Sequence, residues 1–291
     1  MSKVWFITGS SRGLGRALAE AALGRGDRVA ATARTPSALD ALVARYGADA
    51  VAAIPLDVTD PAQAANAVQA ALDAFGRIDV VVNNAGYANV AAIEEFSEQD
   101  FHAQVDTNLW GVVNVTRAAL PVLRAQRSGH VIQISSVGGR TTAPGLGPYQ
   151  LSKWAVEGFS GVLLKEVAHL GIRVTVIEPG GIRTDWAGAS MTVHPVGEDY
   201  EPSVGMMIRL VTANGPESAA GDPAKMAQAI LTVADADNPP AQLLLGSDAI
   251  ALGRAADEAR LAELAQWEQL SLSTDHDDET ERDLSSLLGR G

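Results

Sequence analysis

Short apolar segments alternate with helical segments along most of the 291 residues, and this order constrains the fold more than any other feature. The apolar segments are short and rich in β-branched residues, which is typical of buried parallel strands. The segments between them are rich in alanine and leucine and are predicted as helices. Strands that alternate with helices predict an α/β fold with a doubly wound parallel sheet in one domain.

The expected elements cover residues 3 to 245 and have the following bounds. Strands are expected at residues 3–7, 28–33, 50–56, 78–82, 130–135, 172–177 and 242–245. Helices are expected at residues 14–25, 36–46, 61–75, 101–126, 149–170 and 223–234. We expect a bend at Pro121, because a proline inside a helix removes a backbone hydrogen bond.

Two segments depart from this alternation. Residues 186–221 form a long stretch without a clear pattern, which is interpreted as a lid that is mobile until it closes over ligands. Residues 254–291 contain ten acidic residues and four arginines, and they are predicted as a separate C-terminal extension. It continues an amphipathic helix at 249–270, with Leu261, Leu264 and Trp267 available for a buried face, and ends in a poorly ordered acidic tail. The single main domain is therefore expected at 1–253.

Composition excludes several functions. The net charge of −13 is the wrong sign for a nucleic-acid-binding protein. The absence of cysteine excludes disulfides and thiol nucleophiles, and the five histidines lack ligand spacing, so no metal site is expected. No apolar run approaches the ~20 residues of a membrane helix, and no signal peptide is visible. We therefore expect a cytoplasmic protein that acts on a small molecule.

A glycine-rich turn follows the first predicted strand and opens the first helix. Gly9 permits a sharp turn, Gly13 lets the backbone approach a phosphate, and Gly15 lets the helix pack against the sheet. The amino terminus of that helix then faces the phosphates of a dinucleotide. Three glycines alone are typical of a plain turn, but their place between a strand and a helix indicates nucleotide binding.

Cofactor selectivity is expected at the end of the second predicted strand. NAD sites place an acidic residue there for the ribose 2′-hydroxyl. This strand ends in Arg34 without an acid, and Arg34, joined by Arg12, can pair with a 2′-phosphate. The sequence therefore favours NADP(H), although Arg34 can also be read as a solvated arginine at a strand end.

Tyr149 and Lys153 lie four residues apart, and Ser136 precedes the tyrosine by thirteen residues. A lysine one helical turn away projects from the same face as the tyrosine. Its charge is expected to lower the tyrosine pKa from the usual value of about 10. The serine hydroxyl can bond a carbonyl oxygen that gains charge during reduction. This arrangement predicts hydride transfer to or from a carbonyl, with Tyr149 as general acid/base.

These motifs, with others in the same order, resemble the short-chain dehydrogenase/reductase family, single-domain NADP-dependent branch. The resemblance extends from the first residues to about residue 185, and the last strand adds to it. It implies a Rossmann-like fold, carbonyl reductase activity and association through the two long helices, with a second interface around the last strand in tetrameric relatives. The helix at 249–270 is expected to cover that second interface, so we expect a homodimer and not a tetramer. It is carried by Thr8-Gly9-Ser10-Ser11-Arg12-Gly13-Leu14-Gly15, Asp57-Val58, Asn83-Asn84-Ala85-Gly86, Asn108, Ser136, Tyr149 with Lys153, Pro179-Gly180 with Thr184, and 243–248.

The resemblance also implies a role for each residue. Ser136 orients the carbonyl, Lys153 also binds the nicotinamide ribose, and Asn108 holds a water that links Lys153 to solvent. Further cofactor contacts are implied for Ser11, Leu14, Asp57, Val58, Asn84, Ala85, Gly86, Pro179, Gly180, Ile182 and Thr184. Simpler roles remain open for some of them: Asp57 can cap a turn, and Asn108 can bond the backbone within its helix.

The substrate is less constrained than the reaction. Tyr87, Val90 and the methionines of the 186–221 segment indicate an apolar pocket for a small carbonyl or alcohol. About half of these side chains can instead pack that segment onto the domain. Two other functions stay open: a non-catalytic NADP-binding sensor, and an enzyme that reduces C=N or C=C bonds or epimerises.

Overall fold

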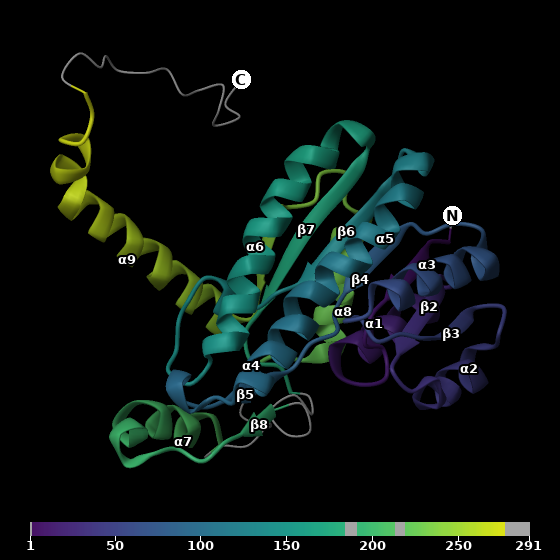
Figure 1. The fold of residues 1–291 in the computed structure, drawn as a ribbon. Coiled ribbons are helices and arrows are strands. Elements are labelled where there is room, and N and C mark those ends of the chain that lie inside the picture. Colours follow the sequence, from purple (N-terminus) through teal and green to yellow (C-terminus); the bar gives the residue numbers. More distant parts are fainter. Residues whose placement is uncertain (1, 184–190, 213–218, 277–291) are drawn as a thin grey trace. The chain divides into compact units, whose positions relative to one another are not determined.

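The structure is a computed structural model that describes residues 2–183, 191–212 and 219–276. Its centre is a parallel sheet of seven strands in the order β3-β2-β1-β4-β6-β7-β9 (Figure 1). The expected doubly wound α/β sheet is therefore confirmed. The strands are β1 (Val4–Ile7), β2 (Arg28–Ala33), β3 (Val51–Pro55), β4 (Val80–Asn83), β6 (Gly129–Ile134), β7 (Ile172–Pro179) and β9 (Gln242–Leu245).

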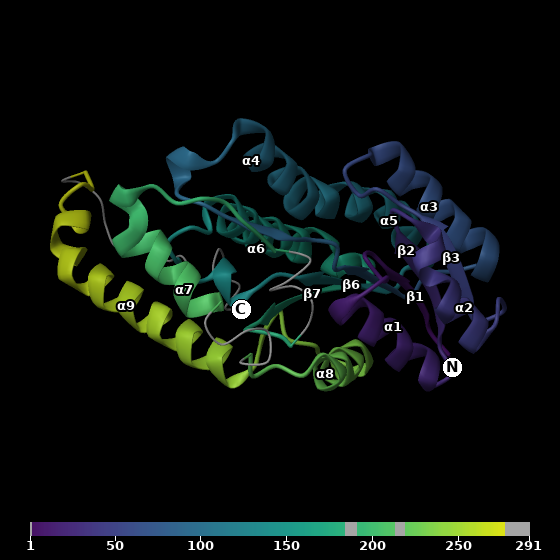
Figure 2. The ribbon, with the colours of Figure 1, turned by 90° about the horizontal axis from the view of Figure 1, so that it is seen from below.

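Helices cover both faces of this sheet (Figure 2). Their bounds are α1 (Gly13–Gly24), α2 (Asp40–Tyr46), α3 (Pro61–Phe75), α4 (Glu98–Val105), α5 (Gly111–Gln126), α6 (Gly147–Val167) and α8 (Pro223–Asp235). Successive side chains of a strand point to opposite faces. Trp5 and Ile7 of β1 therefore pack with residues of α1 and α8, whereas Val4 and Phe6 pack with residues of α3, α5 and α6.

Local sequence signals set several helix ends. Asp60 precedes Pro61 at the start of α3 and accepts hydrogen bonds from the backbone N–H groups of Ala62 and Gln63. Asp222 caps α8 in the same way, directly before Pro223. An aspartate cap followed by proline suits a helix start, because proline needs no hydrogen-bond partner for its nitrogen there. These pairs explain why both starts could be predicted from the sequence.

The helix expected at 101–126 is longer and less regular than predicted. It starts at Glu98, after Ser97 accepts a hydrogen bond from the backbone N–H of Asp100. A π-helical turn, Asp106–Trp110, separates α4 from α5, and Pro121 lies inside α5. Turns of this kind have no clear sequence signal and often occur at functional sites.

The prediction that 186–221 has no regular structure is wrong where the structure describes this segment. A strand, β8 (Met191–Val193), pairs in parallel with β5 (Ala88–Val90). A helix, α7 (Met206–Thr212), follows two short helical turns. The sequence pattern was too short to predict β8, because this strand forms by pairing with a distant segment.

The chain divides into two compact units, residues 1–253 and 254–291. Helix α9 (Ser247–Leu272) begins in the first unit and ends in the second. Taken by itself, the second unit leaves Leu261, Leu264 and Trp267 exposed. The predicted helix is therefore present, but its apolar face is not buried within this unit. The acidic tail from residue 277 onward lies outside the described residues.

Candidate active site

The turn between β1 and α1 needs glycine at two positions. Gly9 has a φ of +67°, a left-handed conformation that favours glycine. A Cβ on Gly15 would lie 2.4 Å from both the Gly9 carbonyl oxygen and Asn84 Nδ2. The backbone of the turn is thus packed closely against the start of α1, leaving no room there for a side chain. A turn of backbone groups at the amino terminus of a helix fits the phosphates of a dinucleotide.

Hydrogen bonds fasten this turn to the segment after β4. The Thr8 hydroxyl oxygen accepts bonds from the backbone N–H groups of Asn84 (2.8 Å) and Ala85 (3.0 Å). Asn84 Nδ2 donates to the carbonyl oxygens of Thr8 (2.9 Å) and Gly9 (3.1 Å). β1 and β4 are neighbours at the point where the strand order reverses, which is where parallel sheets bind nucleotides.

The residues expected around the adenosine end surround this turn. Arg12 and Arg34 are exposed, Ser11 is partly buried, and Leu14 is buried in α1. Val58 is buried, and its carbonyl oxygen accepts a bond of 3.0 Å from Asn114 Nδ2. Asp57 Oδ1 accepts bonds from the Thr59 hydroxyl and backbone N–H. The turn-capping role of Asp57 is therefore present, and its backbone stays at the same edge as Arg34.

The tyrosine, the lysine and the serine meet at the carboxyl end of β6. Tyr149 is 8% exposed and Lys153 is 6% exposed, both on α6. Lys153 Nζ lies 5.7 Å from the centre of the Tyr149 ring and donates a bond of 2.8 Å to the Ile134 carbonyl oxygen. Ser136 Oγ accepts a bond of 3.0 Å from the Gly138 N–H, and the Ser136 hydroxyl also forms a hydrogen bond with Tyr149.

Burial dominates the titration of both groups on α6. It raises the pKa of Tyr149, and the hydrogen bond with Ser136 acts in the opposite direction. It lowers the pKa of Lys153 to about 8, with the charge of Glu157 opposing this shift. The expected lowering of the Tyr149 pKa is thus not found, because the loss of water raises this pKa more than the hydrogen bond with Ser136 lowers it. Tyr149 is a neutral phenol at neutral pH, and Lys153 remains mostly charged.

Asn108 is presented by the π-helical turn and faces the same region. Its Oδ1 accepts a bond of 3.0 Å from the Tyr87 N–H, and its Nδ2 donates one of 2.8 Å to the Tyr87 carbonyl oxygen. A Cβ on Gly86 would lie 3.1 Å from Asn108 Oδ1 and 3.9 Å from Lys153 Nζ. A side chain at residue 86 would therefore crowd Asn108 and contact Lys153.

The segment after β7 contributes the residues expected near the carboxamide. Pro179 is buried at the end of β7, and Gly180 follows it. The Gly181 N–H donates a bond of 2.7 Å to Asp248 Oδ2, and Ile182 forms an isolated parallel bridge with Gly221. Thr184 lies outside the described residues. Asp248 had no predicted role, although its place directly after the last strand could have indicated one.

Three further charged residues near the site were missed from the sequence. Glu178 is fully buried on β7, and both of its carboxylate oxygens lie 2.8 Å from Arg140 Nε. Glu157 lies one helical turn after Lys153 on α6. An acidic residue inside an otherwise apolar strand was the available signal, because such a residue is rarely buried without a partner.

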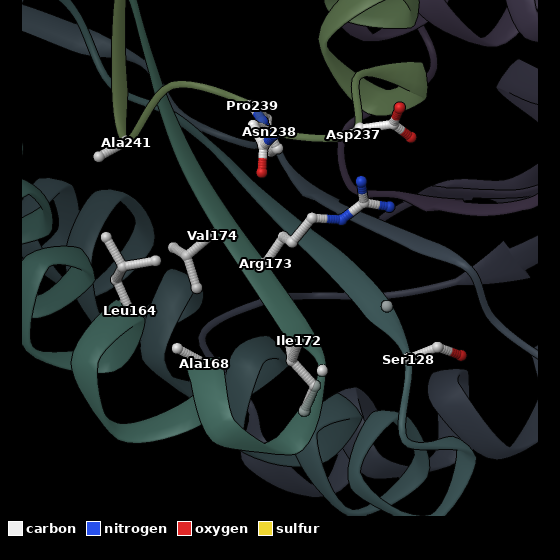
Figure 3. A pocket seen from close by; sticks show the side chains of 12 residues that line it. Ser128, Leu164, Ala168, Ile172, Arg173, Val174, Asp237, Asn238, Pro239 and Ala241 are labelled. Atoms are coloured by element: carbon white, nitrogen blue, oxygen red, sulfur yellow. The ribbon is translucent and has the colours of Figure 1, made fainter.

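A cavity of about 500 Å³ lies elsewhere, at the opposite edge of the sheet (Figure 3). It is lined by residues at the amino-terminal ends of β6 and β7, including Gly129, Ile172 and Arg173. Arg173 Nη1 donates to the Ala236 carbonyl oxygen there, at 2.6 Å. Ligands of parallel sheets bind at the carboxyl ends of the strands. This cavity is therefore not part of the candidate site.

Among the residues that the structure describes, no cluster of histidine and acidic side chains could hold a metal ion. Within the same part of the chain, no helix is both long and apolar enough to cross a membrane. The site thus consists of a dinucleotide cradle beside a buried tyrosine, lysine and serine.

Comparison with known proteins gives a consistent result. A family model described as short chain dehydrogenase matches residues 3–192. Oxidoreductase BOA17 of Botryotinia fuckeliana (strain B05.10) is 53% identical over 275 residues, covering 94% of this chain and 100% of that protein. The crystal structure of a short-chain dehydrogenase from Streptomyces avermitilis has a TM-score of 0.88 and 41% identity, covering 95% of this chain and 99% of that one. An alcohol dehydrogenase from the archaeon Thermococcus sibiricus, complexed with 5-hydroxy-NADP, has a TM-score of 0.69 and 26% identity, covering 84% and 96%.

Proposed function

Since this chain belongs to the short-chain dehydrogenase/reductase family of oxidoreductases, we propose that it transfers hydride between NADP(H) and a carbonyl or secondary alcohol of an apolar small molecule. Tyr149 is the general acid/base in this proposal. The observation that carries it is the burial of Tyr149 and Lys153 together, beside Ser136, at the edge of the sheet that holds the glycine turn.

The protonation state of each side chain decides its role in the proposed reaction. When bound, the nicotinamide supplies or accepts the hydride. Burial keeps the pKa of Tyr149 high, so its phenol holds the proton that a carbonyl oxygen needs during reduction. Ser136 donates its hydroxyl proton as a hydrogen bond to the same oxygen as negative charge develops. The Lys153 ammonium stabilises the phenolate that remains after proton transfer, because an opposite charge favours the ionised form.

Exposed arginines and an absent acid support NADP(H) as the cofactor. Arg34 follows directly after β2, and Arg12 lies in the glycine turn. No acidic residue occupies the end of β2, where NAD sites hold one for the ribose 2′-hydroxyl. A guanidinium can donate several hydrogen bonds to a phosphate, which an NAD ribose lacks. The related alcohol dehydrogenase complexed with 5-hydroxy-NADP is in line with this choice.

A small apolar cluster supports an apolar substrate. Val90, Ala92 and Val204 are buried together, with Leu146 and Tyr200 among the partly buried side chains packed against them. Val204 comes from the segment 186–221, which we propose as the lid that closes over cofactor and substrate. Leu146 directly precedes α6, so the cluster lies next to the helix that carries Tyr149. An apolar wall beside a polar reacting group is typical of small-molecule sites.

The exposed face of α6 supports a homodimer. Leu151, Trp154 and Val162 lie three or four residues, or multiples of this, apart along the helix, and they are 48%, 41% and 58% exposed. Trp110 is also exposed, at the junction of α4 and α5. Large apolar side chains that gather on one surface often mark an interface. We propose a cytoplasmic homodimer in which α5 and α6 form the interface. Light scattering tests this proposal: the parent protein is expected to be a dimer, and the Val162→Lys variant is expected to be a monomer.

The reaction is tested by NADPH depletion over a panel of ketones and aldehydes, with imines, enones and epimerisable substrates in parallel. Alcohols with NADP⁺ test the reverse direction. Turnover of carbonyls, lost in Tyr149→Phe, is the expected result. Turnover of imines or enones alone would assign a different reductase, and product formation without net NADPH loss would assign an epimerase. NADPH binding without turnover of any class would leave a sensor.

A further inference from the structure

A chain of hydrogen bonds connects four separate elements behind the catalytic residues. Glu178 on β7 binds Arg140, which follows the short helical turn after Ser136. Arg140 Nη2 donates a bond of 2.7 Å to Gln242 Oε1 at the start of β9. Gln242 Nε2 donates a bond of 3.0 Å to Glu157 Oε2 on α6. The Glu157 carboxyl group is therefore held in a fixed place by residues far from it in the sequence.

The other carboxyl oxygen of Glu157 points into a tight space. A Cβ on Gly139 would lie 3.0 Å from Glu157 Oε1 and 2.9 Å from Ser135 Oγ. Both oxygens are buried, and they lie close to the same point beside Gly139. Ser135 lies between Ile134, whose carbonyl oxygen binds Lys153, and Ser136. Glu157 thus reaches the same strand end that positions the catalytic groups.

The charged groups around Glu157 come from three elements. Lys153 lies on its own helix, Glu178 lies on β7, and Arg140 pairs with Glu178. Burial raises the pKa of Glu157 to about 7, and the Glu178 carboxylate acts in the same direction, while hydrogen bonds with Ser135 and Gln242 oppose it. Glu157 in turn raises the pKa of Lys153, against the larger effect of burial. The two groups therefore titrate close to each other and to neutral pH.

We propose that Glu157 is a positioning residue for Lys153, whose carboxylate keeps the buried ammonium charged for cofactor binding and proton transfer. The proposal rests on the role proposed above for Lys153 and adds a residue to it. Residues four apart on a helix lie on one face, and an ammonium buried without an opposite charge loses its proton more readily. Ionised Glu157 supplies that charge in the pH range where Lys153 would otherwise become neutral.

The direction of the pH effect follows from these shifts. Below about pH 7, Glu157 is largely protonated and contributes little charge, and Lys153 is charged because the pH lies well below its pKa. Above pH 7, the ionised carboxylate resists deprotonation of Lys153. Removing the carboxylate therefore lowers the Lys153 pKa further, and the loss of ammonium begins at lower pH.

The experiment measures NADPH affinity by fluorescence titration from pH 6 to 9.5 in the full chain, together with kcat/KM where a carbonyl is reduced. Glu157→Gln replaces the carboxylate with a neutral amide of the same size. Glu166 is an exposed acidic residue on α6, so Glu166→Gln is the matched control. We expect the alkaline loss of affinity to begin about one pH unit lower in Glu157→Gln, and to be unchanged in the control. Affinity at pH 6 is expected to stay close to that of the parent.

An alkaline loss at the same pH in parent and Glu157→Gln would overturn the proposal, and so would an equal weakening at every pH, which a purely structural role predicts. If the Glu157→Gln variant does not fold, a measurement on the unaltered protein tests the proposal instead. The side-chain NMR signal of Lys153 should then show a second inflection near the Glu157 titration. A single inflection would also overturn the proposal. Neither the binding titration nor the NMR measurement needs turnover. Both therefore test the role of Glu157 even if the protein reduces no carbonyl.

Discussion

The turn after β1 and the segment after β6 lie at the same edge of the sheet, but they are built from different groups. The first is held by neutral groups, namely backbone amides, Thr8 and Asn84. Its own Arg12, and Arg34 at the end of the neighbouring strand β2, are exposed. The second buries charged or titratable side chains, including Lys153 and Glu178, with Glu157 partly buried beside them. The turn after β1 can form without burying a charged group, whereas the region after β6 depends on pairing between buried charges.

In the proposed function, this difference separates cofactor binding from the chemical step. Neutral hydrogen bonds do not change between pH 5 and 9, so the glycine turn keeps its shape across this range. The pKa values of Lys153 and Glu157 are shifted, so the second region responds to pH. Its buried charge pair also makes it sensitive to the loss of a single partner. Substitutions in the two regions should therefore have effects of different kinds, and the following predictions test this, from the largest effect to the smallest.

Tyr149→Phe should remove most turnover while leaving the nucleotide turn intact. The change removes only the phenol oxygen, so we expect kcat to fall about 10²–10⁴-fold, the usual contribution of general acid catalysis. NADPH affinity, measured by fluorescence, should remain close to that of the parent. Tyr46→Phe, in α2, is the control and should retain full turnover. Near-normal turnover of Tyr149→Phe would contradict the assignment of the acid.

Arg140→Ala should destabilise the fold strongly, because it leaves the buried Glu178 carboxylate unpaired. We expect a loss of about 3–5 kcal/mol in the free energy of unfolding, measured by urea denaturation near neutral pH. Arg16→Ala breaks the Arg16–Glu20 pair, which is partly exposed on α1 beside the turn, and should cost at most about 1 kcal/mol.

Equal losses for the two variants would remove the contrast between the regions. A double variant, Arg140→Met with Glu178→Met, offers a second check. Replacing both partners by apolar groups removes the unpaired charge, so it should recover part of the stability lost in Arg140→Ala.

Gly15→Ala should weaken NADPH binding more than it affects kcat at saturating NADPH. The added Cβ would lie 2.4 Å from the Gly9 carbonyl oxygen, so the turn must shift away from the helix. Overpacking of this kind costs about 1–3 kcal/mol, which corresponds to roughly 5- to 150-fold in affinity if it falls on binding. Gly24→Ala, in the same helix with no atom near the added Cβ, is the matched control. A kcat loss without an affinity change would show that the turn takes part in chemistry.

Arg34→Asp should change which cofactor is preferred, with little effect on the folded state. Arg34 is exposed, so its pairing with a 2′-phosphate is screened by water, and we expect the ratio of kcat/KM for NADPH over NADH to fall about tenfold. Arg34→Lys keeps the charge and should keep most of the preference. A parent protein that uses both cofactors equally well would contradict the role of this arginine.

Much of the fold could be predicted because its signals are local. The strand at 28–33, the helix at 61–75 and the strand at 242–245 have the predicted bounds, because turn residues, caps and apolar runs mark them directly. The four-residue spacing placed Tyr149 and Lys153 on one helix face for the same reason. By contrast, β5 and β8 are short strands that form only by pairing with each other across 100 residues of chain, and the sequence did not show them.

The sequence by itself determined the order of the seven strands of the central sheet along the chain, the glycine turn and the absence of an acid after β2. It also predicted that the tyrosine, lysine and serine lie in one site. These properties depend on residue type and on neighbours a few positions away. Only the tertiary structure decided that burial raises the Tyr149 pKa and that Lys153 donates to Ile134. It also decided that Glu157 joins Glu178 through Arg140 and Gln242. The physical reason is that desolvation and charge pairing depend on atoms brought together from distant segments, and the free energy of an ionised group follows from that full surrounding.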